Sequence, residues 1–108
     1  MADETKIMYS ETAEALLLAN LGFYDTAIPD ALKNYLHSLL NIAHRELQRA
    51  GIVLAQGDLY DDQLQSMYAA YLYRSASKGL AKPPMLAQEI RDRQVEQALA
   101  AADEEGST

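Results

Sequence analysis

The chain of 108 residues contains no cysteine and no tryptophan, and it has only one phenylalanine and three prolines. Without cysteine there can be no disulfide, no thiolate metal ligand and no cysteine nucleophile. No stretch approaches the roughly 18 to 20 apolar residues that a membrane-spanning helix needs, and the N-terminus does not resemble a secretory signal peptide. We therefore expect a domain that is held together by packing alone and that has no membrane partner.

Positive charge is also scarce. Asp and Glu number 16 against 9 Lys and Arg, which gives a formal net charge of −7. Proteins that bind nucleic acids tightly concentrate positive charge to displace counterions from phosphates. We do not expect this chain to hold a DNA backbone, although an acidic surface is compatible with DNA that passes without specific binding.

The most informative feature that is present is an apolar segment, Met67-Tyr68-Ala69-Ala70-Tyr71-Leu72-Tyr73, which ends at Arg74. A helix on the surface of a small domain is usually apolar along one stripe only. Seven consecutive apolar residues cover the whole circumference of a helix. This segment must be surrounded by other helices of the fold or by neighbouring copies, and it points to assembly rather than catalysis.

Capping residues predict the first two helices. Ser10 can cap the first, and Gly22 can end it in the left-handed conformation. The second begins near Pro29, which is tolerated in a first turn, and closes at Gly51. Its apolar residues recur with helical spacing and form one stripe, made of Leu32, Leu36, Leu39, Leu40, Ala43 and Leu47.

Two further helices follow. The short apolar run 52–55 should tuck Ile52 or Leu54 under the bundle, and Asp58 should cap a third helix that continues to about Lys78 and stops at Gly79. Pro83-Pro84 is a stiff break. A fourth amphipathic helix follows it, and residues 103–108 are expected to be a frayed acidic tail.

The predicted fold class is therefore all-α: one domain over residues 1–102, with a small bundle of about four helices, a central antiparallel helix pair and a C-terminal helix after the Pro-Pro break. The expected core comes from the second and third helices and comprises Leu36, Leu39, Leu40, Ala43, Leu47, Leu64, Tyr68, Tyr71 and Leu72.

No catalytic, cofactor-binding or metal-binding residue is predicted, and we expect no enzymatic activity. His37 and His44 are two helical turns apart, about 10 Å along the axis, which is too far to share one metal ion. Asp58, Asp61 and Asp62 could suggest a divalent cation site, but they also suit the positive end of a helix, and that second interpretation is favoured.

Tyrosine dominates the aromatic residues, with seven against one phenylalanine. Its ring gives a large contact area and its hydroxyl tolerates a wet boundary, so it is common at protein interfaces. The densely charged side of the fourth helix can be either a solvated face or the back of a helix that docks elsewhere. The expected subunit or partner interface comprises Tyr73, Arg74, Met85, Leu86, Ile90, Arg91, Arg93 and Leu99.

The order of these features resembles the head–tail connector (adaptor) proteins of tailed bacteriophages. The likeness is carried by Tyr60-Asp61-Asp62-Gln63-Leu64, by the segment 67–74 and by Pro83-Pro84-Met85-Leu86, with 35–43 and 46–52 as the preceding helix and its glycine exit. It covers about residues 12 to 99. Members of that family carry a tryptophan at the position of Tyr71.

This resemblance implies a virion protein of the phage neck, present in the host cytoplasm during assembly. Such a subunit forms a dodecameric ring below the portal protein, joins it to a tail-completion or stopper protein, and extends the DNA exit channel. Residues 52–57 would face the lumen or the tail. The fourth helix would bind the portal, and deleting residues 84–108 should abolish that binding while the remainder stays helical.

An alternative is a small soluble helical adaptor or regulatory domain whose fourth helix enters the groove of another partner protein. It would be a monomer or dimer and never form a ring. A helix-turn-helix DNA-binding domain is the weakest interpretation, since the third helix is apolar where a reading helix needs exposed polar side chains.

Overall fold

The computed structural model describes residues 8–23, 28–55, 57–75 and 82–106, with side chains described up to residue 102. This part of the chain is all-α, as predicted, and contains the helices α1 (Glu11–Leu21), α2 (Asp30–Arg49), α3 (Leu59–Ser75) and α4 (Pro84–Gly106). None of its helices is both long enough and apolar enough to cross a membrane.

The ends of α1 have the predicted caps. The Ser10 Oγ accepts a hydrogen bond from the backbone N–H of Ala13 at 3.1 Å. At the other end Gly22 has φ +86°, and the N–H of Phe23 reaches back to the carbonyl of Leu18 at 2.8 Å. Only glycine adopts that left-handed conformation without a steric penalty, so the sequence correctly predicts where α1 stops.

Replacing Ser10 with alanine should therefore lower the free energy of unfolding by about 1 kcal/mol, because the N–H of Ala13 loses its partner. Urea denaturation followed by circular dichroism measures the change. Ser38→Ala is the matched control, since the Ser38 hydroxyl lies exposed in mid-helix and its bond within the described part of the chain goes to the carbonyl of Asn34. Equal stabilities of the two variants would contradict the capping role.

Two further predicted helix signals are also confirmed. Gly51 ends α2 with φ +90°, and the N–H of Ile52 bonds to the carbonyl of Leu47 at 3.0 Å. The Oδ1 of Asp58 accepts from the N–H groups of Tyr60 and Asp61 at 3.0 and 3.1 Å, which starts α3. These short connections fix how α2 and α3 follow one another.

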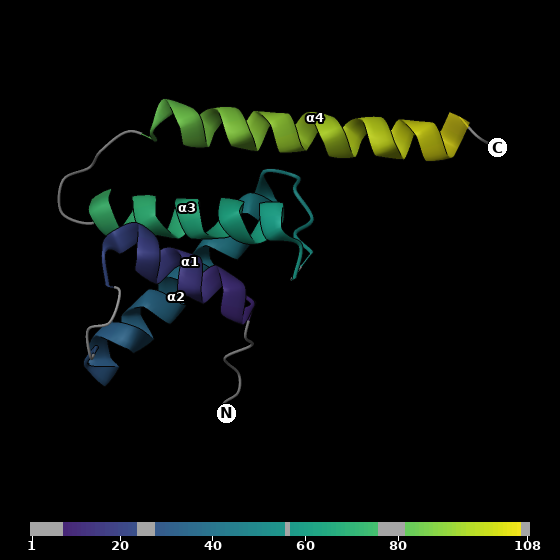
Figure 1. Cartoon of the computed structure of the whole chain (residues 1–108). Helices are drawn as coiled ribbons and strands as arrows, with labels where there is room; N and C mark the ends of the chain where they lie inside the picture. Colours follow the sequence, from purple (N-terminus) through teal and green to yellow (C-terminus); the bar gives the residue numbers. More distant parts are fainter. Residues whose placement is uncertain (1–7, 24–27, 56, 76–81, 107–108) are drawn as a thin grey trace.

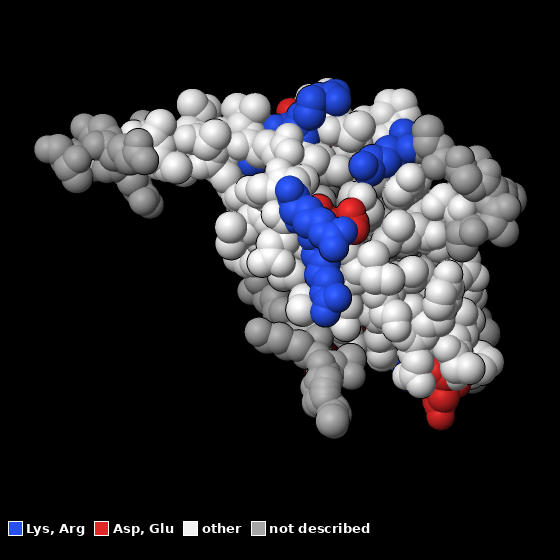
Figure 2. All heavy atoms as spheres, turned by 180° about the vertical axis from the view of Figure 1, so that it is seen from behind, with Lys and Arg blue, Asp and Glu red and all other residues white. Residues whose placement is uncertain are grey.

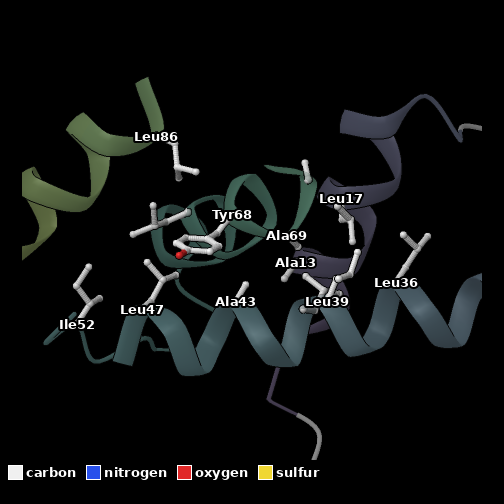
Figure 3. Close-up of a cluster of buried hydrophobic side chains, with 13 residues drawn as sticks. Ala13, Leu17, Leu36, Leu39, Ala43, Leu47, Ile52, Tyr68, Ala69 and Leu86 are labelled. Carbon is white, nitrogen blue, oxygen red and sulfur yellow. The ribbon is translucent and has the colours of Figure 1, made fainter. Parts of the chain in front are cut away.

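Helix α3 lies in the middle of the molecule and packs against each of the other helices (Figure 1). Alanines occupy the crossing points: Ala13 of α1, Ala43 of α2 and Ala69 of α3 are all fully buried. A methyl side chain lets two helix backbones approach closely, so α1 and α2 can both lie against α3. Leu17 from α1 and Leu39 from α2 lie beside these alanines in the same buried cluster (Figure 3).

The predicted core is largely confirmed. Seven of the nine expected core residues are buried, namely Leu36, Leu39, Leu40, Ala43, Leu47, Leu64 and Tyr68. Tyr71 and Leu72 are partly buried and pack against them. Ile52 from the α2–α3 connection is 1% exposed and joins the core, as expected for that short apolar run.

Most of the apolar circumference of α3 is covered by the chain's own helices, with Met67, Tyr71, Leu72 and Tyr73 partly buried. Even Tyr73, predicted to contact another subunit, is half-buried between Phe23 and Tyr35, with ring centroids 6.4 and 6.3 Å away. The segment 67–73 is therefore surrounded mostly by the same fold, so its composition alone does not argue for assembly. Its partly buried Met67 still lines two surface cavities.

One predicted helix end lies outside the described residues, and another differs from the structure. The expected stop near Lys78 and Gly79 lies outside the described residues. At the C-terminus, the backbone of α4 stays helical to Gly106, where the sequence predicted fraying from residue 103. Alanines dominate residues 98–102, and their high helix propensity carries α4 onwards.

Candidate functional site

Helix α4 is fixed to the bundle by an ion pair with a buried carboxylate. Asp61 is 1% exposed, and its Oδ1 lies 2.8 Å from the Nε of Arg93. Its Oδ2 accepts from the Arg93 Nη2 at 3.0 Å and from the N–H of Ala55 at 3.0 Å. The Nη2–Oδ2 contact is a hydrogen bond, whereas the Nε–Oδ1 contact is a close ionic contact without hydrogen-bond geometry.

The same contact keeps the guanidinium charged. The hydrogen bond to Asp61 raises the pKa of Arg93 above its ordinary value, although partial burial acts in the opposite direction. Asp61 is already paired with Arg93, and the positive charge of that guanidinium disfavours a cation at the same carboxylate. No group of three or more His, Asp or Glu side chains in the described residues is arranged to hold a metal ion.

Two glutamines fasten the middle of α4 to the connection between α2 and α3. The Gln94 Nε2 donates to the carbonyl of Ala50 at 2.7 Å. The Gln97 amide pairs with both backbone groups of Val53, accepting from its N–H at 2.9 Å and donating to its carbonyl at 2.8 Å. Residues 52–57 were predicted to face a channel lumen or a tail. One of them, Val53, is held by hydrogen bonds to Gln97 of α4.

Towards its C-terminus the helix projects past the end of α3 (Figure 1), while Ala98 and Ala101 still line a shallow pocket with Val53. We call residues 98–106 the α4 tip. Leu99 is 62% exposed there, and Val95, one turn earlier, is 56% exposed. With Ala102 they form an apolar stripe at i, i+4 and i+7 that no described residue covers.

A second exposed apolar surface runs between α3 and α4, and we call it the α3–α4 groove. Two adjoining cavities of about 330 Å³ and about 220 Å³ share Met67 and Met85 and make it continuous. Tyr60 at one end is 82% exposed, and Met85 in its wall is 69% exposed. Carboxylates flank the Tyr60 end, and Arg74 lines the other.

The structure divides the predicted interface residues into two groups. Met85, Arg91 and Leu99 are exposed and available to a partner. Arg74 is exposed too, but its Nη2 also donates to the carbonyl and side chain of Asn20 at 2.8 and 2.9 Å, which joins the C-terminal ends of α1 and α3.

Three residues of that predicted interface instead hold the chain together. Leu86 is 1% exposed and belongs to the core, Ile90 packs against the core, and Arg93 binds Asp61. Placing Leu86 at an interface is therefore wrong. The first two turns of α4 use their inner face for the fold, which leaves the outer face and the tip for partners.

The histidines have structural surroundings. The His37 Nε2 lies 2.6 Å from the Glu14 Oε2, which links α2 to α1, and its ring stacks on Tyr9 with centroids 5.2 Å apart. His44 is half-buried two turns further along α2. The sequence analysis missed other exposed residues, above all Tyr35, Ile42 and Tyr60, although the seven-residue spacing of the first two is visible in the sequence.

Comparison with family models, with curated proteins and with solved structures finds no match to this chain. The likeness to phage connectors therefore depends on the sequence features given above.

Proposed function

We propose that this protein is a non-enzymatic structural subunit of a phage neck, a head–tail connector that forms a ring under the portal protein and continues the DNA exit channel. The observation that supports this most is the α4 tip. A helix that is anchored by Arg93, Gln94 and Gln97 and then projects with an uncovered apolar stripe is suited to dock on another protein. Its partner in this proposal is the portal.

Net charge agrees with this function. A formal charge of −7 makes the chain a poor binder of phosphate and suits the wall of a channel that DNA must traverse without sticking. The same ring would present its other side to a tail-completion or stopper protein. The protein would be located in the virion neck, after assembly from the host cytoplasm.

The structure indicates a shorter deletion for the test of portal binding. Removing residues 84–108 would take away Leu86 and Arg93, so the core would be uncovered and Asp61 left without its partner. Ending the chain at Gln97 keeps every described anchor. We expect that shorter deletion to reduce co-purification with the portal at least tenfold while the thermal midpoint by circular dichroism changes little.

A pair of substitutions separates the stripe from the tip as a whole. Leu99→Asp places a charge on the apolar stripe and should weaken portal binding as the deletion does. Ala100→Asp is the matched control, since Ala100 is also exposed but lies on the other side of the helix. Portal binding that survives both the deletion and Leu99→Asp would refute the assignment of the tip.

The alternative, a small soluble adaptor or regulatory domain, uses the same tip on a different partner and forms no ring. The portal experiment distinguishes the two functions. A full-length chain that never retains a portal, yet loses another bound protein when Leu99 is replaced, would favour the adaptor.

A further inference from the structure

Helix α2 carries an exposed seam along one flank of its core-facing side, where Tyr35 also contacts Tyr73 of α3. Tyr35 and Ile42 are 42% and 44% exposed, and Arg49 continues them at the same seven-residue spacing. Ser38 and Arg45 lie between them and are exposed as well. A seven-residue repeat keeps these side chains on one line along a helix, as in the seam of a coiled coil. We call this line the α2 seam.

The α3–α4 groove has the same repeat. Tyr60, Met67 and Arg74 follow one another at seven-residue spacing along the floor of the groove. Both lines span fourteen residues, which is about 21 Å of helix. The groove is therefore as long as the seam. It lies on the side of α3 that α2 leaves open, so one copy of the chain cannot bring its own seam and groove together.

The charges at the ends of the two surfaces are complementary. Arg45 and Arg49 lie at the C-terminal end of the α2 seam, and although Arg49 pairs with Glu46 at 3.0 Å, the two arginines leave this end with a net positive charge. Basic side chains are prominent in the view from behind (Figure 2). The groove has the opposite charge at its Tyr60 end, where the lining carboxylates belong to Asp58, Asp61, Glu89, Asp92 and Glu96. Arg93 is the basic residue among them, and it is bound to Asp61.

The far ends agree with the same orientation. When α2 lies antiparallel to α3, Arg49 meets the acidic end of the groove and Ile42 meets Met67. The opposite orientation would bring the arginines of the seam against Arg74.

We propose that the α2 seam of one copy of this chain docks antiparallel in the α3–α4 groove of a second copy. This inference rests on the self-association in the proposed function and names the surfaces that carry it. The two surfaces are different, and a dimer leaves one seam and one groove unfilled. Such head-to-tail contacts continue until the chain of copies closes into a ring or extends as a filament.

Because the chain has no cysteine, single introduced cysteines test this arrangement cleanly. Ile42→Cys and Met67→Cys chains, mixed and treated with a short bismaleimide, should give a covalent dimer, while either variant alone stays monomeric. A chain carrying both cysteines should give a ladder of higher oligomers. Lys33→Cys, exposed on α2 but away from the seam, is the control and should not crosslink to Met67→Cys.

The outcomes separate this inference from the function above it. If sedimentation shows assembly but the mixture yields no covalent dimer, the α2 seam and the α3–α4 groove are not the contact surfaces. The proposed ring would still stand in that case. If neither assembly nor crosslinking occurs at high concentration, the self-association itself fails. A dimer from Ile42→Cys alone would show a two-fold contact between like surfaces and would overturn the head-to-tail arrangement.

Charge reversal gives an independent measurement. Arg45→Glu with Arg49→Glu should reduce crosslinking between Ile42→Cys and Met67→Cys chains at least tenfold. Adding Glu89→Lys and Asp92→Lys to the Met67→Cys chain, which supplies the groove, should restore the crosslinking. Loss without restoration would mean that the arginines do not meet the acidic end of the groove.

Discussion

Replacing Arg93 with alanine is expected to lower the free energy of unfolding by about 3–5 kcal/mol, the loss typical when one member of a buried ion pair is removed. Asp61 is the reason, because it is 1% exposed and its carboxylate would retain only the N–H of Ala55. Total stabilities of single domains are about 5–15 kcal/mol. The change would therefore remove a large share of the stability of a domain in this range.

Denaturant titration measures this effect, and a nearby arginine supplies the control. Arg91 is exposed, and its described hydrogen bond goes to Gln88, one turn away on the same helix. Arg91→Ala should therefore change stability by no more than about 0.5 kcal/mol. A loss below about 1 kcal/mol for Arg93→Ala would show that Asp61 recruits water or another partner.

A double variant tests the mechanism rather than the size of the effect. Asp61→Asn with Arg93→Met removes both charges, while the amide oxygen that this change introduces on α3 can still accept from the N–H of Ala55. Apolar replacement of a buried pair is often neutral. The double variant should thus be more stable than Arg93→Ala alone, because the energetic penalty comes from the unpaired carboxylate.

The sequence could predict the local features of this fold because local features have local causes. Ser10, Gly22, Gly51 and Asp58 act on backbone groups within a few residues, so their roles are visible in the sequence. The apolar stripe of α2 could be predicted equally well, because apolar residues at helical spacing lie on one face and that face must be the buried one.

The contacts of α4 could not be predicted in the same way. Arg93 and Asp61 are 32 residues apart, and each has a complete local explanation, in a charged helix face and at a helix start. Only the packing of α4 across α3 brings them together. The apolar segment 67–73 also shows this limit, since its composition predicts that it is surrounded but does not say which helices surround it.

The exposed surfaces were the hardest to predict. The apolar residues of α4 look alike in the sequence. In the structure they are buried where their turn of the helix meets α3 and exposed elsewhere. Tyr60 and Ile42 resemble ordinary helical residues until the structure shows that nothing described covers them. An exposed binding surface has no local sequence signal other than the spacing of its apolar residues along the helix.

Leu86→Ala and Met85→Ala are expected to differ sharply, although the two residues are adjacent. Leu86 is 1% exposed in the core, and truncating it should lower the free energy of unfolding by about 2–5 kcal/mol through lost burial and a residual cavity. Met85 is 69% exposed in the wall of the α3–α4 groove. Truncating it should change stability by about 0.5 kcal/mol or less.

Their effects on self-association should be reversed. Met85→Ala removes apolar surface from the groove and should weaken crosslinking between seam and groove while the chain stays folded. Leu86→Ala, assayed well below its thermal midpoint, should leave crosslinking close to that of the parent because its side chain adds almost no accessible area to the groove. If Met85→Ala destabilised the fold as much as Leu86→Ala, the first turn of α4 would be oriented differently, and the groove would lose one wall.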